Sequence, residues 1–314
     1  MARHRADEST VGRGACCLTG HLGPNTFVAE CEVTGVVPPS LAELDLSQTT
    51  TLLCDADGNL FPSEEPAFEA STGVVNAFLA DHGVGKRFTP TELRLATTGK
   101  NFRSTIRALA YQFRIPLAPD IAVARGATLR AARYTGTLLE EDVERWVARE
   151  KLVVTAALRR ALRPDPEIRE SLTTLSRRFV LAAVSSSASS RLDACFEATG
   201  LSMLFPESRR FSAEDSLPKP LSKPDPAVYS LAGSTLGVTG RRGLAIEDSA
   251  IGATAAMAAG YPTIGNVQFV PAAERPARIE ALRQVGVVAI MSSWSELADV
   301  LSSDITGHPG VRAS

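Results

Sequence analysis

The chain has 314 residues, with 33 basic and 35 acidic side chains and a formal net charge of −2. This length predicts about two domains, and the near-neutral charge without a basic run argues against nucleic acid as the main partner. No stretch reaches the roughly 20 apolar residues of a membrane span, and the N-terminus lacks an apolar signal-peptide region. Its five cysteines form no C-x-x-C pair, which is typical of a reducing compartment. We therefore expect a cytoplasmic protein.

The two ends of the chain differ in composition from the rest. Residues 1–49 mix arginine, glycine, threonine, glutamate and proline without a sustained period, so we expect an N-terminal extension that is partly disordered or forms a short appendage on the core. Residues 302–314 are predicted to form a frayed tail. The organised part of the chain is therefore predicted to span residues 50–301.

A short apolar run, residues 52–54, is followed by the sequence D-A-D-G, which carries Asp55 and Asp57. Successive residues of a strand point to opposite faces, so these two side chains are predicted to share one side at the carboxyl end of a strand. Open parallel sheets bind their ligands at that end. A calcium loop also uses this spacing, but Phe61 and Pro62 break its ligand pattern. The run therefore predicts a site on a strand rather than an EF-hand.

Residues 64–163 have a largely helical pattern, with apolar side chains at helical spacing. One interruption falls at Gly99, close to the basic side chains of Lys100 and Arg103. Either cation is as well explained by a solvated surface as by contact with a ligand. The sequence R-P-D-P at residues 163–166 ends the helical segment and predicts a hinge.

Residues 179–187 form an apolar run that ends in three serines, Ser185, Ser186 and Ser187. The run predicts a strand that is buried on both faces, and the helical pattern after it ends at Gly200. Hydroxyl groups at a helix N-terminus, together with free backbone N–H groups, suit an anion. The same serines are also explained as simple helix caps.

A lysine stands before a rigid Pro-x-Pro sequence at residues 223–226. The two prolines fix an extended backbone before a helix begins. This placement suits a lysine that must reach a phosphate, which makes Lys223 a candidate, although a lone lysine is also explained as a solvated surface charge. Lys219, which also precedes a proline, is the alternative.

A further apolar run, residues 243–246, ends in the adjacent acids Glu247 and Asp248. A helix of small residues is predicted to follow, so Asp248 is also explained as its N-terminal cap. Together with Asp55 and Asp57, these acids give four carboxyl groups at the ends of two strands. Their convergence is costly without a cation, and an oxygen-rich site of this kind suits Mg²⁺.

In sequence order, these four elements resemble the four motifs of the haloacid dehalogenase superfamily. Asn59 stands where the first motif usually has threonine. The resemblance implies an α/β fold, in which a doubly wound, Rossmann-like parallel sheet carries an inserted, all-helical cap. We assign residues 50–63 and 164–301 to the core and residues 64–163 to the cap.

The resemblance also implies a role for each motif residue. The implied nucleophile is Asp55, the implied general acid and base is Asp57, and Ser185 and Lys223 would hold the transferring phosphoryl group. The implied ligands of Mg²⁺ are Asp55, the backbone carbonyl of Asp57, Asp248 and Glu247, the last directly or through water. The candidate substrate contacts are Ser186 and, in the implied specificity loop of the cap, Gly99, Lys100 and Arg103.

Three functions follow from this resemblance. The first is a Mg²⁺-dependent phosphatase acting on a small phosphorylated metabolite, such as a sugar phosphate or phosphoglycolate. The second is a mutase similar to β-phosphoglucomutase, which is disfavoured because residues 65–68 lack the histidine expected there. A 2-haloacid dehalogenase is disfavoured because Asp57 is present. The third is a non-catalytic member that binds a phosphorylated ligand or a partner protein, against which the complete set of catalytic residue types argues. The sequence predicts no oligomeric state.

Overall fold

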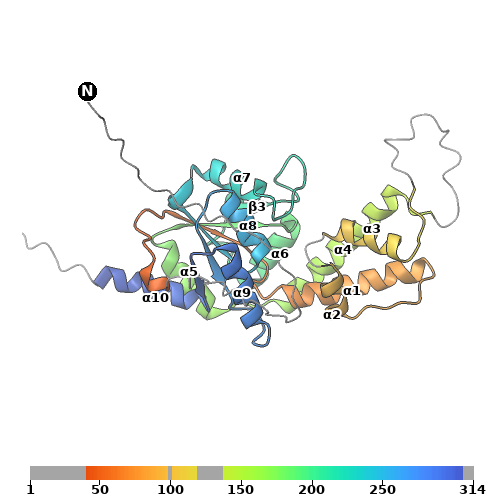
Figure 1. Ribbon diagram of the computed structural model, residues 1–314, viewed down its shortest axis with the longest axis horizontal. Coiled ribbons are helices and arrows are strands. Elements are labelled where there is room, and N and C mark those ends of the chain that lie inside the picture. The colour runs from red at the N-terminus through yellow and green to blue at the C-terminus, as the bar shows by residue number, and fades with distance from the viewer. Residues whose placement is uncertain (1–39, 98–100, 119–136, 307–314) are drawn as a thin grey trace, which may run out of the picture. The chain divides into compact units, whose positions relative to one another are not determined.

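The computed structural model of the protein describes residues 40–97, 101–118 and 137–306. These residues contain a six-stranded sheet with the strand order β3-β2-β1-β4-β5-β6, in which every neighbouring pair is parallel (Figure 1). The strands are β1 (Thr51–Cys54), β2 (Val180–Ser185), β3 (Arg210–Ser212), β4 (Gly243–Glu247), β5 (Thr263–Asn266) and β6 (Ala289–Met291).

Helices precede and follow these strands. In chain order they are α1 (Glu64–Asp81), α2 (Pro90–Thr97), α3 (Phe102–Gln112), α4 (Glu140–Ala161), α5 (Pro166–Ser176), α6 (Ser189–Thr199), α7 (Ala227–Leu236), α8 (Ala250–Ala258), α9 (Arg275–Val285) and α10 (Trp294–Thr306). Short 3-10 helices are η1 (Leu41–Glu43), η2 (Glu207–Arg209) and η3 (Gly240–Arg242).

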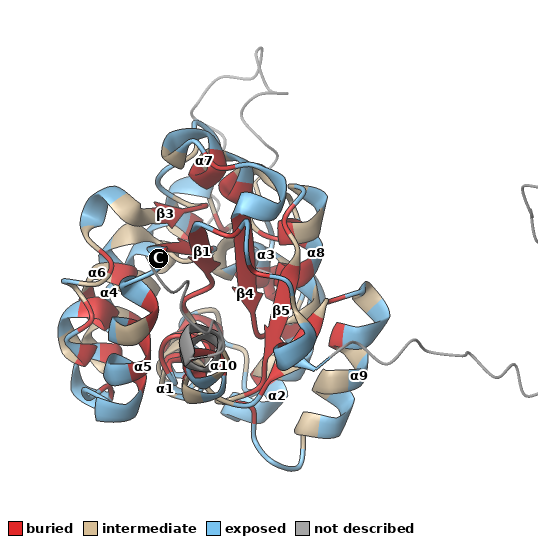
Figure 2. Cartoon of the chain, turned by 90° about the vertical axis from the view of Figure 1, so that its left-hand side faces the viewer, coloured by how far each residue is buried: buried red, intermediate tan, exposed pale blue. Residues whose placement is uncertain are grey.

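Both faces of the sheet are covered, because side chains along the central strands β1, β2 and β4 alternate between two apolar clusters (Figure 2). Leu52 and Cys54 of β1 belong to the cluster that includes buried side chains of α5, α6 and α10. Leu53 belongs to the cluster that includes buried side chains of α7 and α8. Strands buried on both faces have continuous apolar sequences, as seen in β1, β2 and β4. The predicted α/β fold with a doubly wound parallel sheet is therefore confirmed.

The register between β1 and its neighbours β2 and β4 aligns the carboxyl ends of these three strands. Cys54, the last residue of β1, pairs with Ala183 of β2 and with Ile246 of β4. Asp55 and Glu247 each follow one of these paired residues directly. The polar residues that come after the three strands are consequently placed at one edge of the sheet.

Helices α1–α4 lie in the chain between β1 and β2 and have an apolar cluster of their own. Phe78 and Leu79 of α1 belong to this cluster together with Ile106 of α3 and Val143 of α4. This is the segment that we expect to form the cap, and its limits at residues 64 and 163 stay a prediction.

The structure refines the expected organisation near both ends of the core. Leu41 and Leu46 are buried in the main apolar cluster, so residues 40–49 pack on the core, as the appendage that we expect as an alternative to disorder would. At the other end, α10 continues to Thr306, past the expected start of the tail at residue 302. Both segments are too short for their apolar spacing to be distinguished from loop sequence. Residues 1–39 and 307–314 lie outside the described part of the chain.

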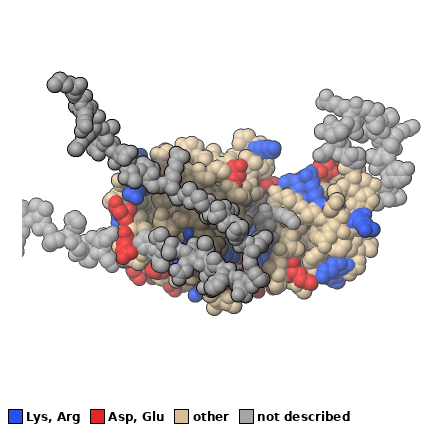
Figure 3. Space-filling model, in the orientation of Figure 1, with Lys and Arg blue, Asp and Glu red and all other residues tan. Residues whose placement is uncertain are grey.

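The surface carries charges of both signs. On the face shown in Figure 3, lysine and arginine side chains lie in small groups among aspartate and glutamate side chains. Within the residues that the structure describes, no helix combines the length and the apolar content needed to cross a membrane.

Candidate active site

Buried polar side chains gather where three neighbouring strands end. Asp55 directly follows β1, Ser185 ends β2 and Glu247 ends β4. They meet because β1 pairs with both β2 and β4. Lys223 approaches from the turn before α7, and all four residues are at least 92% buried. The structure thus brings together one residue from each of the four predicted elements.

The ammonium group of Lys223 joins the elements of this site. Its Nζ atom donates to Asp55 Oδ1 at 2.5 Å, to Glu247 Oε1 at 2.6 Å and to the carbonyl oxygen of Val184 at 2.8 Å. Burial alone would lower the pKa of Lys223, but the charges of Asp55 and Glu247 outweigh burial and raise it. Lys223 therefore remains a cation inside the protein.

Three carboxylates form an acidic cluster beside this lysine. One oxygen atom from each of Asp55, Glu247 and Asp248 lies within 4.8 Å of the others. Burial, together with the charges of Glu64 and Glu247, raises the pKa of Asp248 to about 7. Burial and the neighbouring carboxylates also raise the pKa of Asp55 against the opposing effect of Lys223. The cluster is therefore a place where additional positive charge is stabilising.

The side chain of Asp57 does not join the acidic cluster, which corrects the expectation that four carboxyl groups converge. Its Oδ1 atom accepts from Ser63 Oγ at 2.5 Å and from Arg191 Nη2 at 2.9 Å. Its Oδ2 atom accepts from Ser187 Oγ at 2.6 Å and, at 3.5 Å, from Ser185 Oγ. Burial would raise the pKa of Asp57, but the charge of Arg191 and these hydrogen bonds outweigh it and lower the pKa. Asp57 is therefore held as a carboxylate that can accept a proton.

The three serines after β2 have different surroundings. Ser185 Oγ is buried and accepts from the backbone N–H of Ser187 at 3.0 Å. Ser186 is exposed, and its Oγ accepts from the backbone N–H of Lys223 at 3.2 Å. Ser185 and Ser187 thus face the acids of the site, whereas Ser186 links two loops.

Of the candidates in the cap, the structure describes Arg103, and the contacts of Arg103 are with acids outside the acidic cluster. Arg103 donates to both carboxylate oxygens of Glu144, at 2.5 and 2.9 Å, and lies 3.7 Å from Glu214. Gly99 and Lys100 lie outside the described residues. The contact of these residues with a substrate stays a prediction.

Asn59, which departs from the usual first motif, fastens the loop after β1. Its Nδ2 atom donates to the carbonyl oxygens of Asp55 at 2.8 Å and of Ile246 at 3.1 Å. Its Oδ1 atom accepts from Asn266 Nδ2 at 2.7 Å, and its carbonyl oxygen accepts from Trp294 Nε1 at 2.9 Å. The fully buried amide therefore ties β1, β4 and β5 together below the site.

Besides Ser63, which contacts Asp57, sequence reasoning missed three further residues that contact the predicted acids. They are Arg191, which pairs with Asp57; Tyr229, whose hydroxyl donates to Glu247 Oε1 at 2.6 Å; and Arg278, whose Nη1 donates to Asp248 Oδ2 at 3.0 Å. One signal was available for Arg191, because a cation in the first turn of a helix opposes the helix dipole. For Arg278 on α9 we find no comparable signal in the sequence.

The acidic cluster fits a divalent cation with oxygen ligands. Glu247 Oε2 is buried and has no hydrogen-bond partner within the described ranges. The donor set contains only carboxylate oxygens, which are the ligands that Mg²⁺ prefers. Two cations, Lys223 and Arg278, contact the three carboxylates, so negative charge remains in excess.

Alanine at Gly252 is expected to disturb this cluster. A methyl group on Gly252 would lie 1.9 Å from Glu247 Oε2, so the carboxylate would have to move and leave Lys223 and Tyr229. We expect turnover to fall about tenfold or more, as for loss of groups that orient metal ligands, and the free energy of unfolding to fall by about 2 kcal/mol. Phosphate release and urea unfolding measure the two effects.

Gly73 in α1 provides the control, because no atom lies within 4 Å of a methyl group built there. Gly73→Ala should leave turnover unchanged and stabilise the helix slightly. Equal turnover in Gly252→Ala and Gly73→Ala would show that the position of Glu247 is unimportant.

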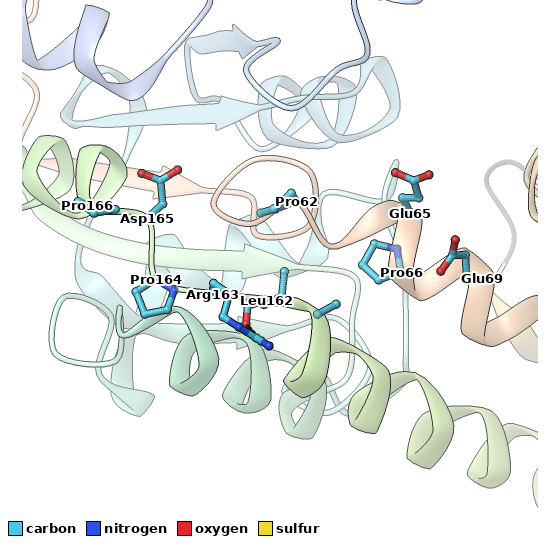
Figure 4. Close-up of a pocket in the computed structure, with 10 residues that line it drawn as sticks. Pro62, Glu65, Pro66, Glu69, Leu162, Arg163, Pro164, Asp165 and Pro166 are labelled. Atoms are coloured by element: carbon cyan, nitrogen blue, oxygen red, sulfur yellow. Dashed lines mark hydrogen bonds between the residues drawn. The ribbon is translucent and has the colours of Figure 1, made fainter.

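A separate cleft lies where the two connections between α1–α4 and the core run beside each other (Figure 4). Pro62, Glu65 and Pro66 line it on one side, and Arg163 and Pro164 line it on the other. It contains none of the acids of the cluster. The cleft therefore marks the expected hinge and not the candidate active site.

Comparison with known proteins agrees with this geometry. Residues 49–260 match the family model described as haloacid dehalogenase-like hydrolase. The chain is 50% identical over 58 residues to a CBBY-like protein from Arabidopsis thaliana. That match spans only 18% of this chain and 18% of the length of the Arabidopsis protein.

Solved structures share the fold at low sequence identity. A haloacid dehalogenase-like protein from Agrobacterium tumefaciens is 20% identical with a TM-score of 0.56, and the match covers 82% of this chain and 99% of that one. A HAD family hydrolase from Deinococcus radiodurans with bound phosphate and sodium is 24% identical with a TM-score of 0.53, and the match covers 82% of this chain and 96% of that one. Mutant CbbY from Rhodobacter sphaeroides in complex with xylulose 1,5-bisphosphate is 21% identical with a TM-score of 0.55, and the match covers 79% of this chain and 96% of that one. Since the family model covers more than half of the sequence, the chain belongs to the haloacid dehalogenase-like hydrolases.

Proposed function

We propose that this hydrolase is a Mg²⁺-dependent phosphatase that cleaves a small phosphomonoester through an aspartyl-phosphate intermediate. The observation that carries the proposal is the contact of buried Lys223 with both Asp55 and Glu247 at the ends of β1 and β4. A carboxylate beside a fixed cation can act as a nucleophile while the cation neutralises the phosphoryl group that it attacks.

The side chains support a reaction in two steps. In the first, an Asp55 oxygen forms a bond to phosphorus, the bond to the ester oxygen breaks, and that oxygen takes from Asp57 the proton that Asp57 gained from water in the second step of the preceding cycle. In the second, water attacks phosphorus and gives a proton to Asp57, and the bond between phosphorus and Asp55 breaks. Lys223 and the Ser185 hydroxyl would stabilise the phosphoryl oxygens in both steps. The carboxylate state in which Asp57 is held suits the second step directly.

The metal would be held by the oxygen-rich side of the site. Its ligands would be Asp55, Asp248 and the backbone carbonyl of Asp57, with Glu247 bound directly or through water. Bound Mg²⁺ supplies positive charge that offsets the charge of the phosphoryl oxygens. Arg278 orients Asp248 for this role through hydrogen bonds to its carbonyl oxygen and to Oδ2.

The names of related structures favour a phosphorylated small molecule as substrate. The Rhodobacter sphaeroides CbbY structures contain xylulose 1,5-bisphosphate or phosphate, and a further similar structure is a putative phosphoglycolate phosphatase from Lactobacillus plantarum. Each shares 20–22% of its sequence with this chain. We therefore propose a sugar phosphate or a phosphoglycolate-like ester and assign no single compound.

A phosphosugar mutase is the second candidate, because putative β-phosphoglucomutases from Bacteroides vulgatus and Thermotoga maritima are among the similar structures. A mutase must keep water from the aspartyl phosphate until a second sugar hydroxyl attacks it. The absence of histidine from residues 65–68 and the availability of Asp57 as a base favour the phosphatase.

The full chain is tested with Mg²⁺ against a panel of phosphorylated metabolites and an aryl phosphate. We expect it to release phosphate and the alcohol or phenol of the cleaved ester in equal amounts. With β-glucose 1-phosphate and a catalytic amount of the bisphosphate, phosphate should appear faster than glucose 6-phosphate. Coupled enzymatic assays measure both products in one mixture. Faster accumulation of glucose 6-phosphate would establish the mutase instead, and no reaction with any ester would favour a binding protein.

A further inference from the structure

Arg191 occupies a place that is unfavourable for an arginine without a partner. It is the third residue of α6, where the positive end of the helix dipole opposes a cation. Its side chain is 22% exposed, so the guanidinium has lost much of its hydration. The charge must therefore be stabilised by the groups around it.

These groups come from two parts of the chain. Arg191 Nη2 donates to Asp57 Oδ1 at 2.9 Å, while its Nε atom is buried without a hydrogen-bond partner in the described residues. Glu150 of α4 is a second acid whose charge stabilises Arg191. Glu150 in turn accepts from Ser71 Oγ of α1 at 3.1 Å. The guanidinium thus has Asp57 on the side of the active site and Glu150 on the side of the helical segment.

The Asp57 carboxylate depends on side chains for its orientation. Three serine hydroxyls and Arg191 reach it from the loop before α1, from the end of β2 and the loop after it, and from the first turn of α6. All of these hydrogen bonds end on a charged carboxylate, but Arg191 is the donor among them that also carries a charge, and its coulombic attraction to Asp57 is one that the hydroxyls lack. Loss of Arg191 would leave a carboxylate that the neutral serine hydroxyls alone hold less firmly.

We propose that Arg191 is a positioning residue that aligns Asp57 to take the proton from the water that cleaves the aspartyl phosphate. This role rests on the proposed function and assigns a residue to its second step. In that step the water oxygen bonds to phosphorus, the bond from phosphorus to Asp55 breaks, and one water proton moves to Asp57. Arg191 touches none of the reacting atoms and acts through the carboxylate that it holds.

Decay of the phosphoenzyme tests this role directly. With 4-nitrophenyl phosphate and Mg²⁺, formation of the aspartyl phosphate needs little help from a proton donor, because nitrophenolate is a weak base. The phosphoenzyme is formed by rapid mixing with labelled substrate, and the remaining substrate is then removed. Samples quenched with acid at successive times give the decay of the labelled phosphoenzyme alone. For Arg191→Gln we expect decay to slow about a hundredfold, in the range of a lost general base, whereas kcat/KM changes by less than about threefold.

Two further variants separate positioning from folding. Arg191→Lys keeps the charge without the planar fork and should slow decay about tenfold, which keeps the test open if the glutamine variant does not fold. Arg210→Gln removes another buried guanidinium, which donates to Asp193 at 2.7 Å and not to the active site. Its phosphoenzyme should decay at the parent rate even if its stability falls.

The outcomes distinguish this role from the function on which it rests. No phosphoenzyme and no phosphate release from the parent chain would overturn the proposed phosphatase, and the role of Arg191 with it. Phosphoenzyme that decays at the parent rate in both Arg191 variants would overturn only the role of Arg191. A fall in kcat/KM equal to the fall in decay rate would show a general structural effect and would also overturn it.

Discussion

Asparagine at position 55 is expected to reduce turnover by at least about four orders of magnitude, because an amide does not attack phosphorus. The change is nearly isosteric, and the amide oxygen can still accept from Lys223, whose Nζ lies 2.5 Å from Asp55 Oδ1. It also removes one negative charge from a buried cluster in which burial and repulsion raise the pKa of Asp55. The midpoint of thermal unfolding should therefore change little. Phosphate release, phosphoenzyme labelling and thermal unfolding measure these effects.

The same substitution at Asp165 provides a matched control. Asp165 caps the N-terminus of α5 by accepting from the backbone N–H groups of Glu167 and Ile168. Asparagine is an equally good cap, so Asp165→Asn should retain full activity. Turnover of Asp55→Asn within about tenfold of the parent would exclude Asp55 as the nucleophile.

Removal of divalent metal is expected to bring hydrolysis to background, and excess Mg²⁺ should restore it. Without the metal, the carboxylates of Asp55, Glu247 and Asp248 would repel an approaching phosphate. Asp248→Ala should raise the Mg²⁺ concentration for half-maximal activity by at least about tenfold, because it removes an oxygen ligand. Titration of Mg²⁺ into the chelated, dialysed protein, followed by phosphate release and by calorimetry, measures activity and binding separately.

Glu280→Ala is the control for this titration, because Glu280 is an exposed acid on α9 that contacts Gln284. It should leave the Mg²⁺ requirement unchanged. Undiminished hydrolysis after thorough chelation would remove the acidic cluster from the mechanism.

The sheet and most of the site were predictable because their signals are local. The central strands are buried on both faces, so their sequences are continuous apolar runs. The polar residues that follow these runs necessarily meet at one edge once the strands are parallel and level. This places Asp55, Ser185 and Glu247 together without knowledge of any helix packing.

The position of the Asp57 side chain could not be predicted in the same way. Alternation of faces holds within a strand, but β1 ends at Cys54, and Asp57 already lies in the turn at Gly58. Gly58 has a φ of +75°, and a methyl group there would lie 2.8 Å from Asp248 Oδ2. Beyond the end of β1, donors from other segments hold the Asp57 carboxylate, so it contacts Arg191 of α6 and Ser187 instead of joining the acidic cluster.

The contacts of Arg191 and Arg278 depend on tertiary packing. Each arginine lies on a helix whose rotation relative to the sheet is set by its apolar residues, such as Phe196 on α6 and Leu282 on α9. The sequence gives that rotation only approximately, and a guanidinium at the end of a long side chain has several possible partners. Hydrogen-bond partners of this kind require the three-dimensional structure.

The helices α1 and α4 are antiparallel, since Ser71 contacts Glu150 and Phe78, farther along α1, contacts Trp146, farther back on α4. The chain therefore leaves the sheet after β1 along α1 and returns toward β2 along the neighbouring helix α4. The entropy cost of closing a loop grows slowly with its length, and added residues at the distant end of this hairpin leave the pairing of Thr51 with Val180 unchanged. Insertions and deletions between α1 and α4 can thus accumulate during evolution without refolding the sheet that carries the acidic cluster.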